Sequence, residues 1–321
     1  MIVITGAYGF IGSCLVQRLN EHGYRDIIVV DDFYKDKKEP NLSGKGIREW
    51  IHRDIFLPWF SKSAKYVDFV FHLGARTDTT SKDKQVFDTL NLNYSKEIWN
   101  TCSHVGVPLI YASSAATYGD GSHGYNDDHA GLSSLKPMNL YAESKHEFDL
   151  WAIAQKPAPP RWTGLKFFNV YGPNEYHKAR MASVVWHGYK QIAENGMLKL
   201  FKSHKKGIAD GEQKRDFIYV KDIADICIHF MVNECTNGIY NAGTGQARTF
   251  LDLGHALFRS LDMPAQIDFI PTPDSIRETY QYYTEAEMTK LRGSGYQNNF
   301  TSLEEGVTEY VRDFLLSGKY Y

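Results

Sequence analysis

Short apolar runs alternate with helical patterns over the first 115 residues of the chain. The runs lie at residues 2–4, 27–30, 67–73 and 107–111. They are continuously apolar, which is typical of parallel strands that are covered by helices on both faces. Between the first two runs, apolar residues recur at helical spacing over 11–19, and Gly23 follows where such a helix would end. This order predicts an α/β fold with a doubly wound, Rossmann-type parallel sheet.

After residue 115 the pattern predicts further elements and then loosens. Helices are expected over 140–155, 181–195, 250–261 and 301–316, and strands over 163–170 and 216–220. Residues 202–215 are polar and contain glycine, which indicates a loop. We expect residues 1–171 to form the Rossmann-type unit, with returning segments near 216–250. Residues 172–321 are expected to form mainly a smaller C-terminal α/β unit.

The composition fits a globular protein and argues against several other classes. Of 321 residues, 43% are hydrophobic and 23% are charged, and no apolar run approaches the ~18 residues of a membrane span. The net charge of −2 argues against a broad nucleic-acid surface. The four cysteines are scattered without a CxxC pair, so we expect reduced thiols, no metal site and no disulfides. A strand that begins at residue 2 predicts that no signal peptide is present.

A glycine-rich turn joins the first predicted strand to the first helix. It reads Gly6-Ala7-Tyr8-Gly9-Phe10-Ile11-Gly12. Glycines at such a turn let the backbone approach a pyrophosphate at the helix N-terminus, so the turn predicts dinucleotide binding. Asp31 and Asp32 end the second strand, where an acid usually holds ribose hydroxyls and favours NAD. Four basic residues that could hold a 2′-phosphate, or could simply be solvated, are Lys35, Lys37, Lys38 and Arg53.

The strongest candidate chemistry is a Tyr141–Lys145 pair four residues apart, which shares one helix face. An ammonium beside a phenol favours the phenolate, so Tyr141 could exchange a proton with a substrate hydroxyl near neutral pH. Ser114 follows the strand predicted at 107–111, and its hydroxyl could hydrogen-bond the reacting oxygen. The alternatives are an exposed helix pair and a serine that only caps a turn.

Several motifs spread over nearly the whole chain agree with these sites. They are GAYGFIG (6–12), HLGA (72–75), Asn91, SSAATYG (113–119), YAESK (141–145), FNVYGP (168–173) and RDFIYVKDIAD (215–225). With them the chain resembles the extended short-chain dehydrogenase/reductase family, which modifies nucleotide sugars. The resemblance implies bound NADP, with NAD as the other option, and a small nucleotide-sugar substrate. It also implies a homo-oligomer in the cytoplasm, with a pentamer as the specific expectation, and no nucleic-acid or membrane partner.

Residues 169–184 are similar to the branch of this family that inverts C6 of ADP-activated heptoses. The tail segments 277–281 and 306–310, with Thr284, are also similar to it. The resemblance implies transient oxidation at C6 to a ketone by the cofactor, followed by re-reduction from the other face. One acid/base must then serve each face, and the resemblance assigns these roles to Tyr141 and Lys178.

The resemblance extends to individual positions. Catalytic roles fall on Tyr141, Lys178, Ser114 and Lys145. Positions that match cofactor contacts are Gly6, Gly9, Phe10, Ile11, Gly12, Asp31, Asp32, Lys38, Arg53, Leu73, Gly74, Ala75, Arg76, Thr77, Asn91, Lys145, Val170 and Lys178. Positions that match substrate contacts are Asn169, Arg180, His187, Phe201, Lys202, Ser203, His204, Arg215 and Tyr280. Arg180 and the longer 202–215 loop depart from the branch and bear on which sugar is bound.

Three other functions compete with this interpretation. A dehydratase would carry an Asp-Glu pair after its serine or threonine, where this chain has Ala115-Ala116-Thr117. Another nucleotide-sugar epimerase or reductase, such as a UDP-hexose 4-epimerase, stays open. A non-catalytic dinucleotide-binding sensor is disfavoured, because it would need neither Tyr141 nor Lys145.

Overall fold

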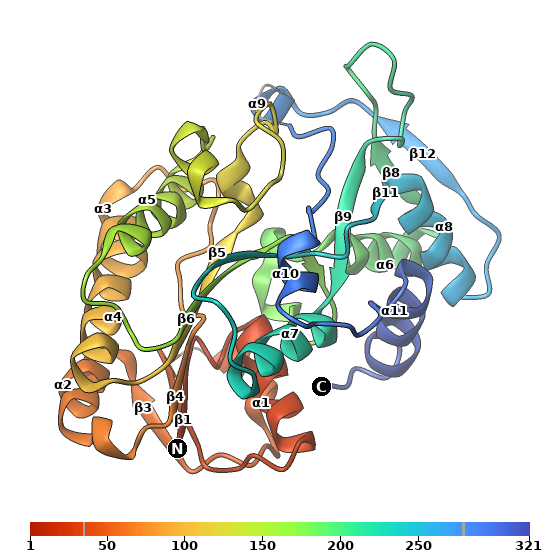
Figure 1. The fold of residues 1–321 in the computed structure, drawn as a ribbon. Coiled ribbons are helices and arrows are strands. Elements are labelled where there is room, and N and C mark those ends of the chain that lie inside the picture. The colour runs from red at the N-terminus through yellow and green to blue at the C-terminus, as the bar shows by residue number, and fades with distance from the viewer. Residues whose placement is uncertain (35, 278–279) are drawn as a thin grey trace.

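The computed structural model describes residues 1–34, 36–277 and 280–321. Its centre is a seven-stranded, all-parallel sheet with the strand order β10-β6-β5-β4-β1-β2-β3 (Figure 1). The strands are β1 (Ile2–Thr5), β2 (Ile27–Asp31), β3 (Glu49–His52), β4 (Phe69–His72), β5 (Leu109–Ser114), β6 (Trp162–Phe167) and β10 (Gly238–Ala242). The order reverses next to β1, which is the arrangement of a Rossmann-type sheet.

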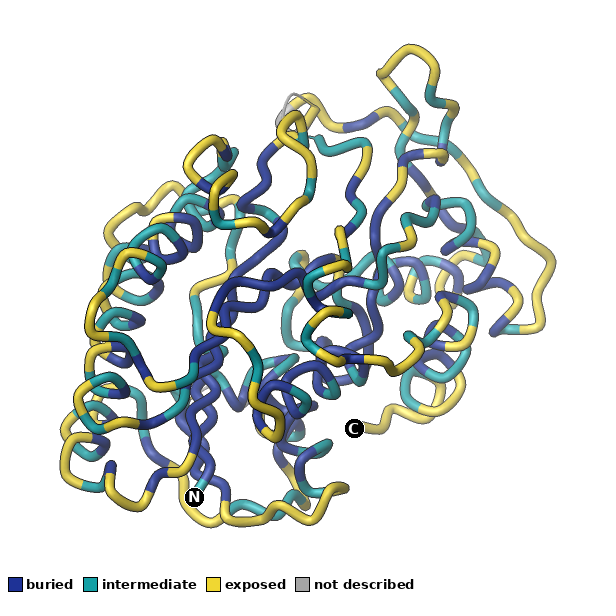
Figure 2. Tube along the Cα trace, viewed as in Figure 1, coloured by how far each residue is buried: buried dark blue, intermediate teal, exposed yellow. Residues whose placement is uncertain are grey.

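Helices cover both faces of this sheet. They are α1 (Phe10–Glu21) and α7 (Val220–Val232) on one face, and α2 (Arg53–Ser63), α4 (Tyr94–Val105) and α5 (Leu140–Ala154) on the other. Successive strand residues point to opposite faces, so Ile2 and Ile4 join the core under α1 and Val3 joins the core under α2. Figure 2 shows buried residues running through the central strands, with exposed residues on the outer turns. The predicted doubly wound fold is confirmed.

A smaller part forms around two short sheets. One sheet has the order β11-β9-β7, and the other pairs β12 with β8. The strands are β7 (Asn169–Tyr171), β8 (Leu198–Phe201), β9 (Lys214–Tyr219), β11 (Ala247–Thr249) and β12 (Ile267–Ile270). The helices are α6 (Val184–Asn195), α8 (Phe250–Ser260) and α11 (Leu303–Glu309), with a π-helical segment at Tyr310–Leu315. These elements share a separate hydrophobic core. The remaining helices are the short α3 (Lys84–Phe87), α9 (Asp274–Arg277) and α10 (Thr289–Gly293).

Several element boundaries differ from the predictions, and three of them have a clear structural cause. The strand expected over 163–170 breaks at Phe168 into β6 in the main sheet and β7 in the small one, although the apolar run is continuous. The strand expected at 216–220 begins at Lys214, because residues 214–216 pair with β11. The helix expected from residue 181 begins at Val184, where the Ser183 hydroxyl caps it. Within the described residues, no helix is both long and apolar enough to span a membrane.

Candidate active site

A cleft of about 1240 Å³ lies at the carboxyl ends of the central strands. It is lined by residues that follow β1, β2, β4 and β5, and by the 177–185 segment that leads into α6. Ligands of open α/β sheets bind beyond these strand ends, at the point where the strand order reverses. The cleft therefore lies where such a fold offers a ligand site, between the main sheet and the smaller part.

The glycine turn forms the floor of this cleft. Gly6 has a φ of 70°, and a Cβ at this position would lie 2.6 Å from the backbone of Gly74. A Cβ on Gly12 would lie 2.3 Å from the Gly6 carbonyl oxygen. Gly9 precedes the first turn of α1, and no side chain caps that helix. The turn thus requires glycine and leaves the N-terminus of α1 open to the cleft, which fits a pyrophosphate.

Acidic and basic side chains meet at the end of β2. The Asp31 carboxylate accepts hydrogen bonds from the Tyr8 amide at 3.0 Å and the Asp32 amide at 2.8 Å. The Lys38 ammonium lies 3.5 Å from Asp31, and the Arg53 guanidinium lies 3.7 Å from Asp32. Asp31, Lys38 and Arg53 line the cleft, whereas Asp32 lies beside it. Lys37 is exposed, and Lys35 lies outside the described residues.

Asn91 supports the cleft from behind and does not line it. Its side chain accepts a hydrogen bond from the Arg76 amide at 2.7 Å and donates one to the Arg76 carbonyl at 2.9 Å. It also donates to the Ser144 hydroxyl on α5 at 3.0 Å. Asn91 therefore fixes the loop after β4, whose residues 73–77 all line the cleft, relative to the helix that carries Tyr141.

Tyr141, Lys145 and Ser114 come together as the sequence predicts. Tyr141 and Lys145 project from the first turns of α5, which is capped by Asn139, and Ser114 ends β5. All three line the cleft. The Ser114 oxygen accepts a hydrogen bond from the Ala116 amide at 3.1 Å, so this serine also caps its turn.

The electrostatics of Tyr141 differ from the expectation. Burial raises the pKa of Tyr141, and a hydrogen bond with Ser114 works against that rise. The Lys145 ammonium donates to the Ala112 carbonyl at 2.7 Å, and Lys145 is not among the groups that shift the pKa of Tyr141. Burial lowers the pKa of Lys145 itself to about 8, and Asp149 counteracts the shift. Lys145 is thus held in the wall of the cleft by the backbone of β5.

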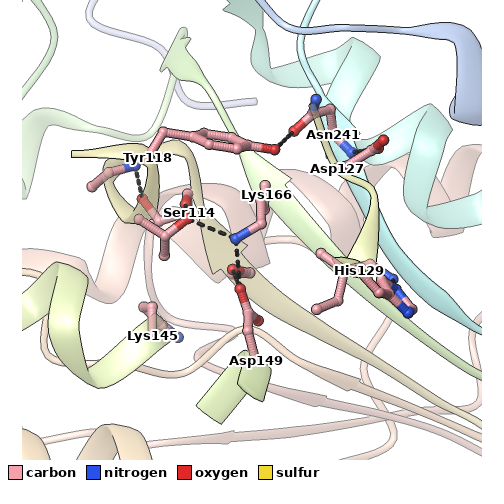
Figure 3. A network of polar contacts seen from close by, with 12 residues as sticks. Ser114, Tyr118, Asp127, His129, Lys145, Asp149, Lys166 and Asn241 are labelled. Atoms are coloured by element: carbon pink, nitrogen blue, oxygen red, sulfur yellow. Dashed lines mark hydrogen bonds and ion pairs between the residues drawn. The ribbon is translucent and has the colours of Figure 1, made fainter. Parts of the chain in front are cut away.

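A buried ion pair joins this helix to the central sheet (Figure 3). Lys166 of β6 and Asp149 of α5 are both 0% exposed, and their charged atoms lie 2.7 Å apart. The Asp149 carboxylate also accepts from the Ser113 hydroxyl at 2.6 Å and the Tyr111 hydroxyl at 3.0 Å. Lys166 donates to the Thr117 hydroxyl at 2.6 Å. The pair therefore ties α5 to the strand and turn that carry Ser114.

Lys178 lines the same cleft as Tyr141 but comes from a different segment of the chain. It belongs to an irregular segment between β7 and α6, and its ammonium lies 5.2 Å from the centre of the Phe10 ring. Burial lowers the pKa of Lys178, and Glu175 raises it. Among the described residues, no hydrogen-bond or ion-pair partner contacts this ammonium. It is therefore available to a ligand in the cleft.

Arg180 crosses the mouth of the cleft. Its guanidinium lies 3.1 Å from both carboxylate oxygens of Asp78 and also contacts the Thr80 hydroxyl. Arg180 is 67% exposed, and Asp78 is 19% exposed. The contact joins the segment after β7 to the loop after β4, so it connects the two parts of the molecule above the cleft.

The predicted substrate residues divide into two groups. Asn169 and Arg180 line the cleft with the catalytic and cofactor positions. The residues that do not line it are His187, Phe201, Lys202, Ser203, His204, Arg215 and Tyr280. Arg215 lies over the rings of Tyr280 and Phe250 at 5.4 and 5.6 Å and donates to the Gln281 carbonyl. Because Phe250 and Gln281 line the cleft, Arg215 and Tyr280 lie at its border.

Several residues of the site were not predicted from the sequence. Asp149 had a signal, because it follows Lys145 by one helical turn on the same face. Glu175 had none, since an acid in a loop is usually solvated. Gln281 and Thr284 line the cleft and belong to the tail segments, but no role was predicted for them. In the same tail, Glu278 and Thr279 lie outside the described residues.

Known proteins match both the fold and the full length of the chain. Residues 2–243 match the model of the NAD dependent epimerase/dehydratase family. Two relatives named ADP-L-glycero-D-manno-heptose-6-epimerase, from Fusobacterium nucleatum and Nitratidesulfovibrio vulgaris, are 47% and 46% identical over 98% of this chain and 98% of their own.

A solved structure of an enzyme with the same name is also similar to this chain over nearly its full length. The Helicobacter pylori enzyme of that name has a TM-score of 0.80 at 26% identity, over 97% of this chain and 95% of the other. The resemblance to nucleotide-sugar enzymes of the extended short-chain type is confirmed. The chain belongs to the NAD dependent epimerase/dehydratase family.

Proposed function

We propose that the protein converts ADP-D-glycero-D-manno-heptose to ADP-L-glycero-D-manno-heptose by inverting C6. The names of the full-length relatives at 46–47% identity support this substrate. The observation that carries the proposal is that Tyr141 and Lys178 line one cleft. They come from elements far apart in the chain, and both line the cavity that begins at the glycine turn. An inversion needs one proton-transfer group for each face of the carbon.

The residues around the glycine turn would hold a nicotinamide dinucleotide. The Gly6–Gly12 turn leaves room for backbone approach to the pyrophosphate, and the loop 73–77 lines the same cavity. When bound, the cofactor supplies reversible removal and return of a hydrogen at the substrate carbon. We propose NADP specifically, with NAD as the alternative. The support is that Lys38 and Arg53 line the cleft, while the Asp31 carboxylate already accepts two amide hydrogen bonds.

Tyr141 would exchange the proton of the C6 oxygen on one face. Ser114 hydrogen-bonds Tyr141, so it can share the reacting oxygen and oppose the effect of burial on the Tyr141 pKa. Lys145, held by the Ala112 carbonyl, would contact the cofactor. Lys178 would exchange the proton on the other face after the ketone has turned. Burial lowers the pKa of Lys178 and so favours its neutral amine, and the charge of Glu175 opposes that shift.

The smaller part of the chain would hold the nucleotide sugar. We propose that residues 1–171, with the returning segments near 216–250, form the cofactor unit and that residues 172–321 mainly form the substrate unit. Asn169 and Arg180 would contact the sugar or its diphosphate from inside the cleft. The cluster around Arg215 and Tyr280 would hold the ADP portion at the border of the cleft.

We also propose a cytoplasmic homo-oligomer, with a pentamer as the specific expectation. The support is the family resemblance, together with large apolar side chains that a single chain leaves exposed, such as Tyr34, Trp50 and Ile55. Light scattering after size-exclusion chromatography would measure the oligomeric state.

Incubation of the purified protein with the ADP-activated D-epimer tests the function. The expected product is the L-epimer, resolved by NMR or chromatography, without added cofactor. Mass analysis of the cofactor released on denaturation distinguishes NADP from NAD. Turnover of UDP-galactose in the absence of heptose inversion would instead identify a UDP-hexose 4-epimerase.

A further inference from the structure

Glu175 is a buried acid in the segment that carries Lys178. The segment 172–183 leaves β7 and ends where α6 begins. Glu175 is 0% exposed, although burial of a carboxylate is costly unless hydrogen bonds and an opposite charge compensate it. The proposed chemistry of C6 inversion does not by itself require this residue.

The Glu175 carboxylate connects the two ends of the segment. One oxygen accepts hydrogen bonds from the Ser183 hydroxyl at 2.6 Å and from the Gly172 amide at 3.4 Å. The other oxygen accepts from the Ser183 amide at 2.5 Å. All three partners are donors, which is the pattern that suits an ionised carboxylate. One side chain therefore closes residues 172–183 into a loop beside the cleft.

The closed loop contains a strained residue next to Lys178. Ala179 has a φ of 47° and a ψ of −125°, a conformation that residues with a Cβ rarely adopt. Such strain persists only where the surrounding structure imposes it, and it concentrates at functional sites. Backbone hydrogen bonds on both sides fix this turn, from Lys178 to the Glu175 carbonyl at 2.9 Å and from Ala182 to the Ala179 carbonyl at 3.1 Å.

Glu175 is also the acidic group that acts on Lys178. It raises the pKa of Lys178 against the lowering caused by burial. Conversely, burial raises the pKa of Glu175, while the Ser183 hydrogen bonds and Lys178 lower it. The loop therefore carries its own counter-charge, Glu175, for an ammonium that no described acid contacts directly.

We propose that Glu175 is a positioning residue for Lys178: its buried carboxylate keeps the 172–183 loop closed, so that the strained turn at Ala179 directs the ammonium into the cleft. This inference rests on the proposed role of Lys178 in C6 inversion. A capping role limited to α6 is the competing explanation, because Ser183 also accepts from the Trp186 amide at 3.3 Å.

The other titratable groups that face this pair stay uncharged near neutral pH. Cys14 of α1 and Tyr310 of the π-helical segment face Glu175, and His177 neighbours Lys178. Burial raises the pKa of Cys14 to about 12 and the pKa of Tyr310 well above its ordinary value. Burial, with Lys38 and Lys178, lowers the pKa of His177 to about 4. Tyr176 also faces Glu175, and burial raises its pKa well above its ordinary value. These neighbours therefore do not change charge near neutral pH.

A labelling titration of Lys178 tests the inference without relying on activity. The whole protein is treated briefly with acetic anhydride over a range of pH, and mass spectrometry measures the fraction of Lys178 acetylated. In Glu175→Gln the loss of the negative charge lowers the pKa of Lys178, so its labelling midpoint moves to lower pH. Ser183→Ala is the matched control, because it weakens the loop closure but keeps the charge, and its midpoint stays near that of the unmodified protein.

Steady-state kinetics complete the test. In Glu175→Gln we expect kcat to fall by about 10- to 100-fold with little change in KM, as for a displaced proton-transfer group. Ser183→Ala should lower kcat by a smaller factor. An unchanged labelling midpoint together with unchanged kcat in Glu175→Gln would overturn the inference.

Two further outcomes separate the possibilities. If Glu175→Gln does not fold, a folded Ser183→Ala protein with full kcat overturns the positioning role by itself. If the midpoint moves but no substrate epimer forms in the unmodified protein, then the proposed function fails, while the coupling of Glu175 to Lys178 stands.

Discussion

The two sides of the cleft hold the proposed proton-transfer groups, Tyr141 and Lys178, in different ways. Tyr141 projects from α5, a helix of 15 residues that the buried Asp149–Lys166 pair ties to the central sheet. Lys178 projects from an irregular segment whose shape depends on Glu175 and on a strained turn at Ala179. A helix face is defined by successive backbone hydrogen bonds, whereas a loop is defined by a few side-chain contacts. Loss of the contacts that support α5 should therefore appear first as lost stability, and loss of the contacts that shape the loop as lost turnover.

Removal of either proton-transfer group should have the largest effect. In Tyr141→Phe and Lys178→Met we expect inversion to fall by about 10²- to 10⁴-fold, the range for a positioned acid or base. The melting temperature and the amount of bound cofactor should change little. An NMR assay of the two epimers measures the loss, and Lys190→Met, at an exposed lysine of α6, is the control. If Lys178→Met still inverts C6 at the full rate, then C6 inversion does not need a second proton-transfer group.

Disruption of the buried ion pair should produce the next largest effect, on stability. Asp149→Asn leaves Lys166 as a buried charge without its partner, which typically costs about 3–5 kcal/mol in the free energy of unfolding. Urea denaturation followed by fluorescence measures this loss. The double variant with Lys166→Met should recover part of it, because no charge is then left unpaired.

An exposed lysine–aspartate pair provides the control for the loss of stability in Asp149→Asn. Lys84 and Asp88 lie 2.8 Å apart on the exterior, at 57% and 37% exposure. Asp88→Asn should lower the free energy of unfolding by less than about 1 kcal/mol, because solvent screens exposed pairs. Equal losses in Asp88→Asn and Asp149→Asn would contradict the supporting role of the buried pair.

Replacement of Arg180 should have a moderate effect on substrate binding. Arg180→Ser removes a cation from the mouth of the cleft, while Asp78 keeps its contacts with Arg76 and Thr80. We expect KM to rise by up to about tenfold, the value of one charge-assisted hydrogen bond, with the melting temperature nearly unchanged. Initial-rate kinetics at varied substrate concentration measure the change. A lower KM would mean that Arg180 obstructs the cleft and does not hold the substrate.

Relief of the strained turn should have the smallest effect. Ala179→Gly removes strain but also loosens the unfolded chain, so the two terms nearly cancel and stability should change by no more than about 1 kcal/mol. Ala130→Gly, at an exposed position with ordinary backbone angles, should lower stability by about 0.5–1 kcal/mol. Thermal melting compares the two, and a larger loss in Ala179→Gly than in Ala130→Gly would argue against strain at this turn.

The sequence predicted the main sheet and the helix side of the site well. Continuous apolar runs are typical of buried parallel strands, and the spacing of Tyr141 and Lys145 follows directly from helix geometry. The loop side was predicted only through family resemblance, and only for Lys178 and Arg180. The role of Glu175 depends on contacts between residues 172 and 183 that no periodicity encodes, and its burial runs against the usual behaviour of an acid in a loop.

The smaller part was predicted less well for a similar reason. The break at Phe168 moves the chain from one sheet to another without a change in the apolar pattern. Arg215 was expected at the end of a loop, yet pairing with β11 places it in a strand, where aromatic rings surround its guanidinium. Both outcomes depend on pairing between segments that are distant in sequence, which local patterns do not contain.

In the proposed mechanism C6 inverts through transient oxidation, with Tyr141 and Lys178 serving opposite faces. The most direct measurement follows the ADP-activated D-epimer, labelled with deuterium at C6, by NMR during turnover in ordinary water. The account predicts that both epimers accumulate with the deuterium still at C6, because the same hydrogen is removed and returned, and that Lys178→Met leaves the substrate uninverted. Replacement of the C6 deuterium by solvent hydrogen, or inversion at the normal rate in Lys178→Met, would contradict it.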